Sequence, residues 1–311
     1  NTGTVTVGAG RTWTITNGTF APQQGGGVLA GSGGTLTLAN VTTAFPTSFT
    51  LAGLNISGAG TTTFATGFTL GALNISGGTV SLGANLSTTG MVLNIASATI
   101  NGPGTITNVA GQTMTLKSST IAATSGLNNQ GTLLVNGLVP INGPVTTAAG
   151  ALVRLLPDNT TGQAVLTVAT GFTNLGAIEL SSAVLGYASR LTVTSGTLTN
   201  AATGTIATLV GAGGTRTLDA ELDNQGTVTL TQPLTLSHTS GPGAAHTNSG
   251  TIDVSADWTL TQSGTPASFT NTGTVTVGPG RTWAISGGTL VPQQGGGALA
   301  GSGGTLTLAA V

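Results

Sequence analysis

The sequence predicts an all-β fold, a right-handed parallel β-helix (β-solenoid) with about 12 coils in each 270-residue period. Three observations predict it. A long segment recurs at an offset of 270 residues, a shorter motif recurs every 19 to 26 residues, and short alternating segments are separated by glycine. Each observation is typical of a chain that winds in stacked coils.

The long repeat defines the expected organisation. Residues 1–41 return as residues 271–311 with 33 of 41 positions identical. We expect residues 1–270 to be one full period and 271–311 the start of the next, within a single continuous rod. Because neither end carries a cap or a leader, we also expect the chain to continue beyond both ends.

The shorter motif sets the coil length. An apolar residue, a polar residue, Asn, any residue and Gly recur at Phe172, Leu222, His246 and Phe269, with a weaker copy at Leu198. The tripeptide Leu-Asn-Ile keeps a similar spacing, beginning at Leu54, Leu73 and Leu93. Twelve coils at roughly 4.8 Å each would rise roughly 58 Å per period.

Four- to six-residue segments of strict alternation predict the strands. Examples are residues 4–7, 35–38, 227–230 and 251–254, in which an aliphatic residue alternates mostly with Thr. Period-two patterning of β-branched residues indicates strands with one buried face. The residues expected to point inward are Val5, Val7, Leu36, Leu38, Val228, Leu230, Ile252 and Val254. Glycine interrupts the windows that a helix would need, so no α-helix is expected.

The recurring Asn predicts a ladder along the solenoid axis. A stacked amide can donate to the next amide and satisfy backbone groups at a corner, although a ligand-binding polar row is the alternative. The expected structural ladder consists of Asn129, Asn174, Asn200, Asn224, Asn248 and Asn271. Two residues later stand the corner glycines, for which a tight corner predicts positive φ. These are Gly176, Gly226, Gly250 and Gly273.

Two aromatic features also follow the coil spacing. Trp258 and Trp283 are one coil apart, which predicts an aromatic stack between adjacent coils; an exposed sugar-binding platform is the alternative. His246 falls in the apolar row of the motif and is expected to be a neutral core or corner histidine. His238 lies eight residues earlier, but two His without a third ligand make a poor metal site.

Charge is scarce, with 6 Lys plus Arg and 7 Asp plus Glu in 311 residues. Such a surface cannot neutralise a run of phosphates, which argues against nucleic-acid binding, and no apolar stretch is long enough for membrane insertion as a helix. One charged cluster stands out, formed by Arg216, Asp219, Glu221 and Asp223. We expect a solvated strand face partly offset by Arg216; an acid/base pair or a Ca²⁺ site is the alternative. No catalytic residue, metal site or cofactor is predicted, and the protein is not expected to be an enzyme.

The Asn-x-Gly-Thr corners, the Thr-Leu-Thr-Leu strands and the long near-identical repeat resemble the β-helical repeat regions of large bacterial surface proteins, of the filamentous haemagglutinin and autotransporter-passenger type. The resemblance covers the whole chain and rests on composition and rhythm. It implies an extracellular or cell-surface location and a role as an adhesin, stalk or fibre. The absence of Cys fits a secreted bacterial fibre.

The expected function is therefore a structural or adhesive segment of a long extracellular fibre. Its expected partners are itself, through end-to-end continuation and lateral bundling, and a surface or polysaccharide ligand. Two alternatives remain open. An ice-binding solenoid would use the Thr-x-Thr segments, and a polysaccharide-processing β-helix enzyme would need a groove lined with several charged residues.

Overall fold

The computed structural model describes residues 1–182, 186–238 and 243–311. These residues form a right-handed parallel β-solenoid of about 13 turns, which confirms the predicted fold class and agrees with the expected coil count. Within the described ranges there is no α-helix, and a single 3₁₀ turn, η1, covers Gln24–Gly26. Two compact units are present, residues 1–133 with 139–145 and residues 134–138 with 146–311. The 270-residue period remains a prediction from the sequence.

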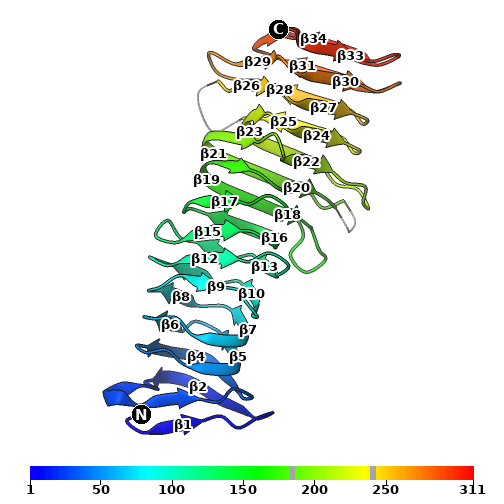
Figure 1. The fold of residues 1–311 in the computed structure, drawn as a ribbon. Coiled ribbons are helices and arrows are strands. Elements are labelled where there is room, and N and C mark those ends of the chain that lie inside the picture. The colour runs from blue at the N-terminus through cyan, green and yellow to red at the C-terminus, as the bar shows by residue number, and fades with distance from the viewer. Residues whose placement is uncertain (183–185, 239–242) are drawn as a thin grey trace. The chain divides into compact units, whose positions relative to one another are not determined.

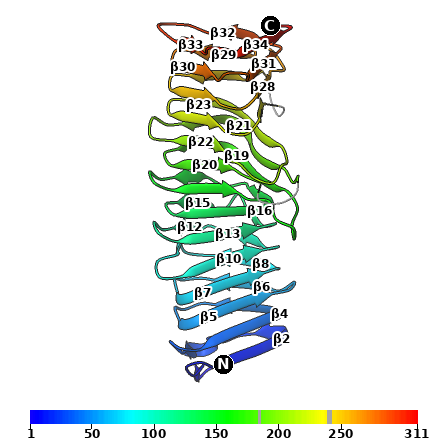
Figure 2. The same cartoon turned by 90° about the vertical axis from the view of Figure 1, so that its right-hand side faces the viewer.

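Unit 1 has three sides built from parallel strands (Figure 1). The first side consists of β2 (Thr12–Phe20), β4 (Thr35–Phe45), β5 (Thr50–Ser57), β7 (Thr69–Ser76), β10 (Val92–Ala96) and β13 (Thr113–Lys117). The ends of β2 and β4 turn a corner into the second side, followed by β6 (Thr61–Phe64), β8 (Thr79–Leu82), β11 (Thr99–Asn101) and β14 (Thr120–Ile121). The third side holds β1 (Thr4–Thr6) and β3 (Val28–Ala30), then β9 (Leu86–Ser87), β12 (Thr105–Asn108) and β15 (Gly126–Asn129). Figure 2 shows β5, β7, β10 and β13 one above another.

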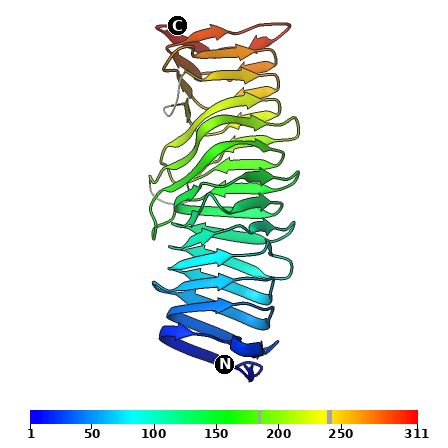
Figure 3. The ribbon, with the colours of Figure 1, turned by 90° about the vertical axis from the view of Figure 1, so that its left-hand side faces the viewer.

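Two strands, β16 (Thr132–Ile141) and β17 (Val145–Thr147), contribute residues to both units. Unit 2 repeats the three-sided coil, and Figure 3 shows its strands stacked one above another. One side holds β18 (Leu152–Leu155), β20 (Ala177–Leu180), β22 (Thr205–Thr208), β24 (Thr227–Leu230), β27 (Thr251–Val254), β30 (Thr274–Val277) and β33 (Ala298–Ala300). The next side holds β19 (Ala164–Asn174), β21 (Ser189–Asn200), β23 (Arg216–Asn224), β25 (Leu234–Ser237), β28 (Trp258–Thr261), β31 (Thr282–Ser286) and β34 (Thr305–Ala309). The ends of β19, β21 and β23 turn into the last side, which β26 (Ala245–Asn248), β29 (Ser268–Asn271) and β32 (Thr289–Val291) continue.

The core lies inside each coil, where the alternating aliphatic residues stack on their counterparts in the next coil. Val228, for example, is in register with Ile252, and Ile252 with Val275. Of the eight residues expected to point inward, seven are buried; Val5 is half-buried because β1 pairs with β3 on one side only. Period two therefore identified the inner face, as the parallel stacking of like residues requires.

Candidate functional site

Five asparagines of unit 2 form a continuous hydrogen-bonded row. Asn174, Asn200, Asn224, Asn248 and Asn271 lie in register on adjacent strands and are at most 1% exposed. Each Nδ2 donates to the Oδ1 of the next asparagine, over 2.9, 2.8, 2.7 and 2.7 Å. This confirms the predicted Asn ladder.

The same amides also bind the backbone at the corner that follows each strand. The Asn224 Nδ2 donates to the carbonyl oxygens of Gly226, at 3.4 Å, and of Thr251, in the next coil, at 3.2 Å. Asn200 makes the matching contacts with Gly204 and Thr227. Each amide thus satisfies carbonyls in its own coil and the next, which is a structural role and not a ligand site.

Unit 1 contains a shorter row of the same kind. Asn129, which the motif predicted, accepts a 2.8 Å hydrogen bond from the Nδ2 of Asn108, and Thr88 donates to the Oδ1 of Asn108 over 3.3 Å. Asn108 and Thr88 were not predicted. Asn108 precedes Val109 and Ala110 and so lacks the Asn-x-Gly spacing. The one available signal was its position 21 residues before Asn129.

The prediction of positive φ at the corner glycines is wrong. Gly176, Gly226, Gly250 and Gly273 do not adopt positive φ. A side chain is excluded there for another reason: a Cβ on Gly250 would lie 2.1 Å from the carbonyl oxygen of Gly226, and one on Gly273 would lie 2.1 Å from that of Gly250. The corners need glycine because successive coils approach closely at this point, not because the chain turns through the left-handed region.

A second asparagine row, on the outward face of unit 1, comes from the Leu-Asn-Ile tripeptides. Asn94 donates to Asn74 over 2.9 Å, Asn74 to Asn55 over 3.0 Å, and Asn55 to the hydroxyl of Thr37 over 3.2 Å. These side chains are half-buried, in contrast to the inner row. The tripeptide spacing was a signal for this row, although the sequence interpretation used it only to set the coil length.

The two tryptophans stack as predicted. The rings of Trp258 and Trp283 are 4.7 Å apart with an interplanar angle of 6°, and the Phe269 ring meets both edge-on. Both indoles are at most 2% exposed. Since neither ring face is open, the alternative of a sugar-binding platform is excluded at these residues.

The charged cluster of β23 differs from the expected solvated face. Asp219 is 1% exposed and pairs with Arg190, while Arg216, 2% exposed, donates to the carbonyl oxygens of Leu209, Gly213 and Gly214. Arg216 therefore does not offset the acids. The expected face is not formed because β23 turns a corner between Asp219 and Glu221, where its pairing with β21 shifts. The alternation of inward and outward side chains is broken at this point.

The other two acids of the cluster are half-buried. Thr197 donates to Glu221 over 2.6 Å and Thr247 to Asp223 over 2.5 Å. Asp223 also accepts a 2.7 Å hydrogen bond from the Nε2 of Gln225, and Glu221 a 3.3 Å hydrogen bond from the backbone N–H of Ala245.

His246 is a buried histidine, 1% exposed, in the apolar row between Leu222 and Phe269. Its Nδ1 accepts a 3.1 Å hydrogen bond from the backbone N–H of Leu222. Burial lowers the pKa of His246 to about 4; nearby Glu221 raises this pKa and nearby His238 lowers it further, so the ring is neutral at pH 7, as predicted. In the ranges that the structure describes, no three His, Asp or Glu side chains gather as a metal ion would require.

No family model, curated protein or solved structure matches the chain. Among the residues that the structure places, no helix has the length and hydropathy of a membrane span.

Proposed function

We propose that the chain is a structural or adhesive segment of a long extracellular bacterial fibre or surface protein, built from tandem 270-residue β-solenoid periods. The observation that carries the proposal is that the two copies of the repeat fold alike. Asn1 donates to the carbonyl oxygen of Pro22 over 2.9 Å, and its copy Asn271 donates to that of Pro292 over 2.8 Å. Gly27 and Gly297 likewise lie against the backbone of Asn1 and Asn271.

A repeated solenoid segment lengthens a structure without new chemistry. The Asn ladder satisfies buried polar groups of one coil on the next, so a further period can be added wherever the register is kept. Asn271 accepts from Asn248 over 2.7 Å, and the copy of Asn271 at the other end of the period, Asn1, carries the same acceptor atom. End-to-end continuation, within one giant chain or between subunits, is therefore part of the proposal.

The low charge and the resemblance to filamentous haemagglutinin and autotransporter passengers support the remaining parts. A surface with 13 charged residues in 311 lets neighbouring fibres approach without strong repulsion, which favours lateral bundling and contact with a surface or a neutral polysaccharide. The resemblance supports the extracellular location.

Ice binding is supported more weakly. Thr205, Thr227, Thr251 and Thr274 lie in register on unit 2. The parallel rank two residues further on, however, is interrupted by Ala207 and Asp253. Ice binding favours uniform ranks, so we place the fibre role first. A catalytic role for the chain is not proposed.

The test is to insert one additional 270-residue period into the chain and to measure both proteins by electron microscopy. We expect the rigid length to grow by roughly 58 Å, the rise of about 12 coils. A Gly/Ser insertion of equal length is the control and should add no rigid length. The proposal is wrong if the added period forms a separate particle on a flexible joint, or if the chain hydrolyses a polysaccharide. Retention on polysaccharide-coated beads distinguishes an adhesive segment from a purely structural one.

A further inference from the structure

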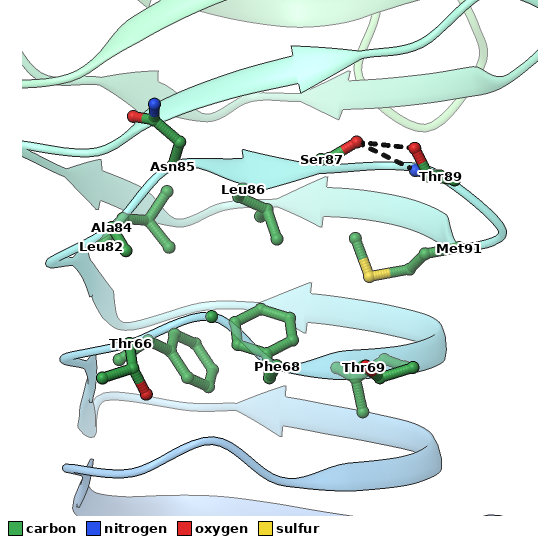
Figure 4. Close-up of a pocket in the computed structure, with 13 residues that line it drawn as sticks. Thr66, Phe68, Thr69, Leu82, Ala84, Asn85, Leu86, Ser87, Thr89 and Met91 are labelled. Atoms are coloured by element: carbon green, nitrogen blue, oxygen red, sulfur yellow. Dashed lines mark hydrogen bonds between the residues drawn. The ribbon is translucent and has the colours of Figure 1, made fainter.

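The third side of unit 1 is interrupted between β3 and β9. The two intervening coils pass this side through residues 46–49 and 65–68 without forming a strand. Above the second of these segments, a cavity of about 250 Å³ separates the coil of Gly67 to Thr69 from the coil of β9 (Figure 4). The cavity thus exists because residues 65–68 and β9, which belong to consecutive coils, do not pair with each other.

The buried side chains that line the cavity are apolar. Phe64, Leu70, Leu82, Leu86 and Met91 line it, and each is at most 7% exposed. In Figure 4 the thioether of Met91 extends into the space between Leu86 and Phe68.

The half-buried ring of Phe68 is held in place by the aromatic column of unit 1. Its centroid lies 4.5 Å from that of Phe64 and 5.5 Å from that of Phe49. The cavity therefore offers a fixed aromatic ring and a polarisable sulfur.

Polar side chains also line the cavity, namely those of Thr66, Thr69, Asn85, Ser87 and Thr89. The hydroxyls of Ser87 and Thr89 are 2.8 Å apart, and Asn85 accepts a 2.9 Å hydrogen bond from the backbone N–H of Thr105. Figure 4 shows the polar atoms of these three residues on the side away from Phe68. No residue lining the cavity is ionisable.

We propose that this cavity binds a small neutral aromatic molecule, of the size of phenol or indole. Apolar cavities of on the order of 150 Å³ take up benzene. The present cavity is larger, is open to solvent, and combines its apolar residues with the polar side chains of Asn85, Ser87 and Thr89. A ring placed here stacks against Phe68 and contacts the sulfur of Met91, both favourable geometries. A charged ligand would lose its hydration without gaining a counter-ion, which excludes aromatic acids.

The experiment is a titration of the full 311-residue chain with indole, followed by NMR. We expect saturable one-to-one shifts confined to residues 64–91, and an intermolecular Overhauser effect between indole and the methyl group of Met91. The Met91 contact is a direct readout that needs no variant. Indole-3-acetate should bind at least tenfold more weakly than indole.

Two matched substitutions locate the site. Ala84→Phe fills the cavity, since Ala84 lines it, and should weaken indole binding at least tenfold. Ala110→Phe adds the same ring at an exposed turn of unit 1 outside the cavity and should leave binding unchanged. Circular dichroism and thermal unfolding establish that both variants are folded. The proposal is overturned if indole gives no saturable binding, if it binds without contacting Met91, or if glucose or N-acetylglucosamine binds here and indole does not.

Discussion

A single asparagine of the inner ladder makes contacts in two neighbouring coils. Asn224 accepts from Asn200, donates to Asn248 and also donates to the carbonyl oxygen of Thr251. Because the amide is fully buried, water cannot replace these partners when the side chain is removed. The ladder is therefore a point at which one residue affects the stability of several coils.

Replacement of Asn224 by Ala should lower the free energy of unfolding by about 1 to 3 kcal/mol, because the buried groups of its neighbours lose their hydrogen bonds. Asn159→Ala, at an exposed position of the same unit, is the control and should change stability by less than about 0.5 kcal/mol. Urea unfolding followed by circular dichroism measures both. Equal stabilities of the two variants would contradict a structural role for the ladder.

His246 makes stability depend on pH. Its pKa is about 4 in the folded protein, below the ordinary value of 6.5, so the unfolded chain binds the proton more tightly. Stability should therefore be fully retained above pH 6.5 and fall as the pH decreases from 6.5 to 4, by on the order of 3 kcal/mol in total. Protonation would also remove the Nδ1 acceptor of the Leu222 N–H.

The measurement is the difference in unfolding free energy between the parent chain and His246→Phe from pH 7 to pH 4. Phe is the residue that occupies the same row in the next coil, at position 269. The parent should lose stability relative to this variant as the pH falls. Parallel pH profiles would show that His246 is not the responsible group.

At the scale of the strand, burial is decided by how many neighbouring strands are present. Leu38 and Leu308 occupy the same place in the two copies of the repeat, yet Leu38 is 1% and Leu308 is 52% exposed. Strand β4 pairs with β2 on one side and β5 on the other, whereas β34 pairs with β31. The same five-residue pattern thus forms a core only when coils stack on both of its sides.

The corner glycines set the distance between stacked strands. Gly250→Ala should destabilise the protein by more than about 2 kcal/mol, since the new Cβ would lie 2.1 Å from a backbone oxygen that cannot move away alone. Gly67→Ala is the matched control, because a Cβ at Gly67 meets nothing within 4 Å and the backbone there is not in the left-handed region. It should be neutral or stabilising by up to about 1 kcal/mol. Thermal unfolding of both variants checks this, and similar losses at the two sites would refute close approach as the reason.

For the whole molecule, stability comes from stacked apolar and amide rows, with ion pairs a minor part. Two ion pairs in the described part of the chain join Arg154 with Glu179 and Arg190 with Asp219, and the arginine in each is more than a third exposed. Exposed ion pairs contribute little and are screened by salt. This predicts a molecule whose stability hardly responds to ionic strength.

Raising NaCl from 0.05 to 0.5 M should therefore change the free energy of unfolding by less than about 1 kcal/mol at pH 7. Urea unfolding at the two salt concentrations measures it. A loss of several kcal/mol at high salt would indicate that ion pairs contribute more than the contacts described above. Arg190→Gln provides a second check, because it removes the cation that pairs with the buried Asp219 and should be destabilising at both concentrations.

The sequence by itself determined the features that repeat. Alternation of Thr with Val, Leu or Ile set the inner face, and the spacing of Asn174 to Asn271 placed these amides in one ladder. Both succeed because parallel coils put like residues directly above one another, so a periodic sequence is also a periodic structure.

The tertiary structure decided the features that depend on differences between coils. It buried Asp219 at a shifted corner of β23, and it brought successive coils so close at the corner glycines that a Cβ does not fit there. It also left a cavity between Phe68 and Leu86. None of these follows from local pattern, because each depends on how the length and register of one coil fit those of the coil packed against it.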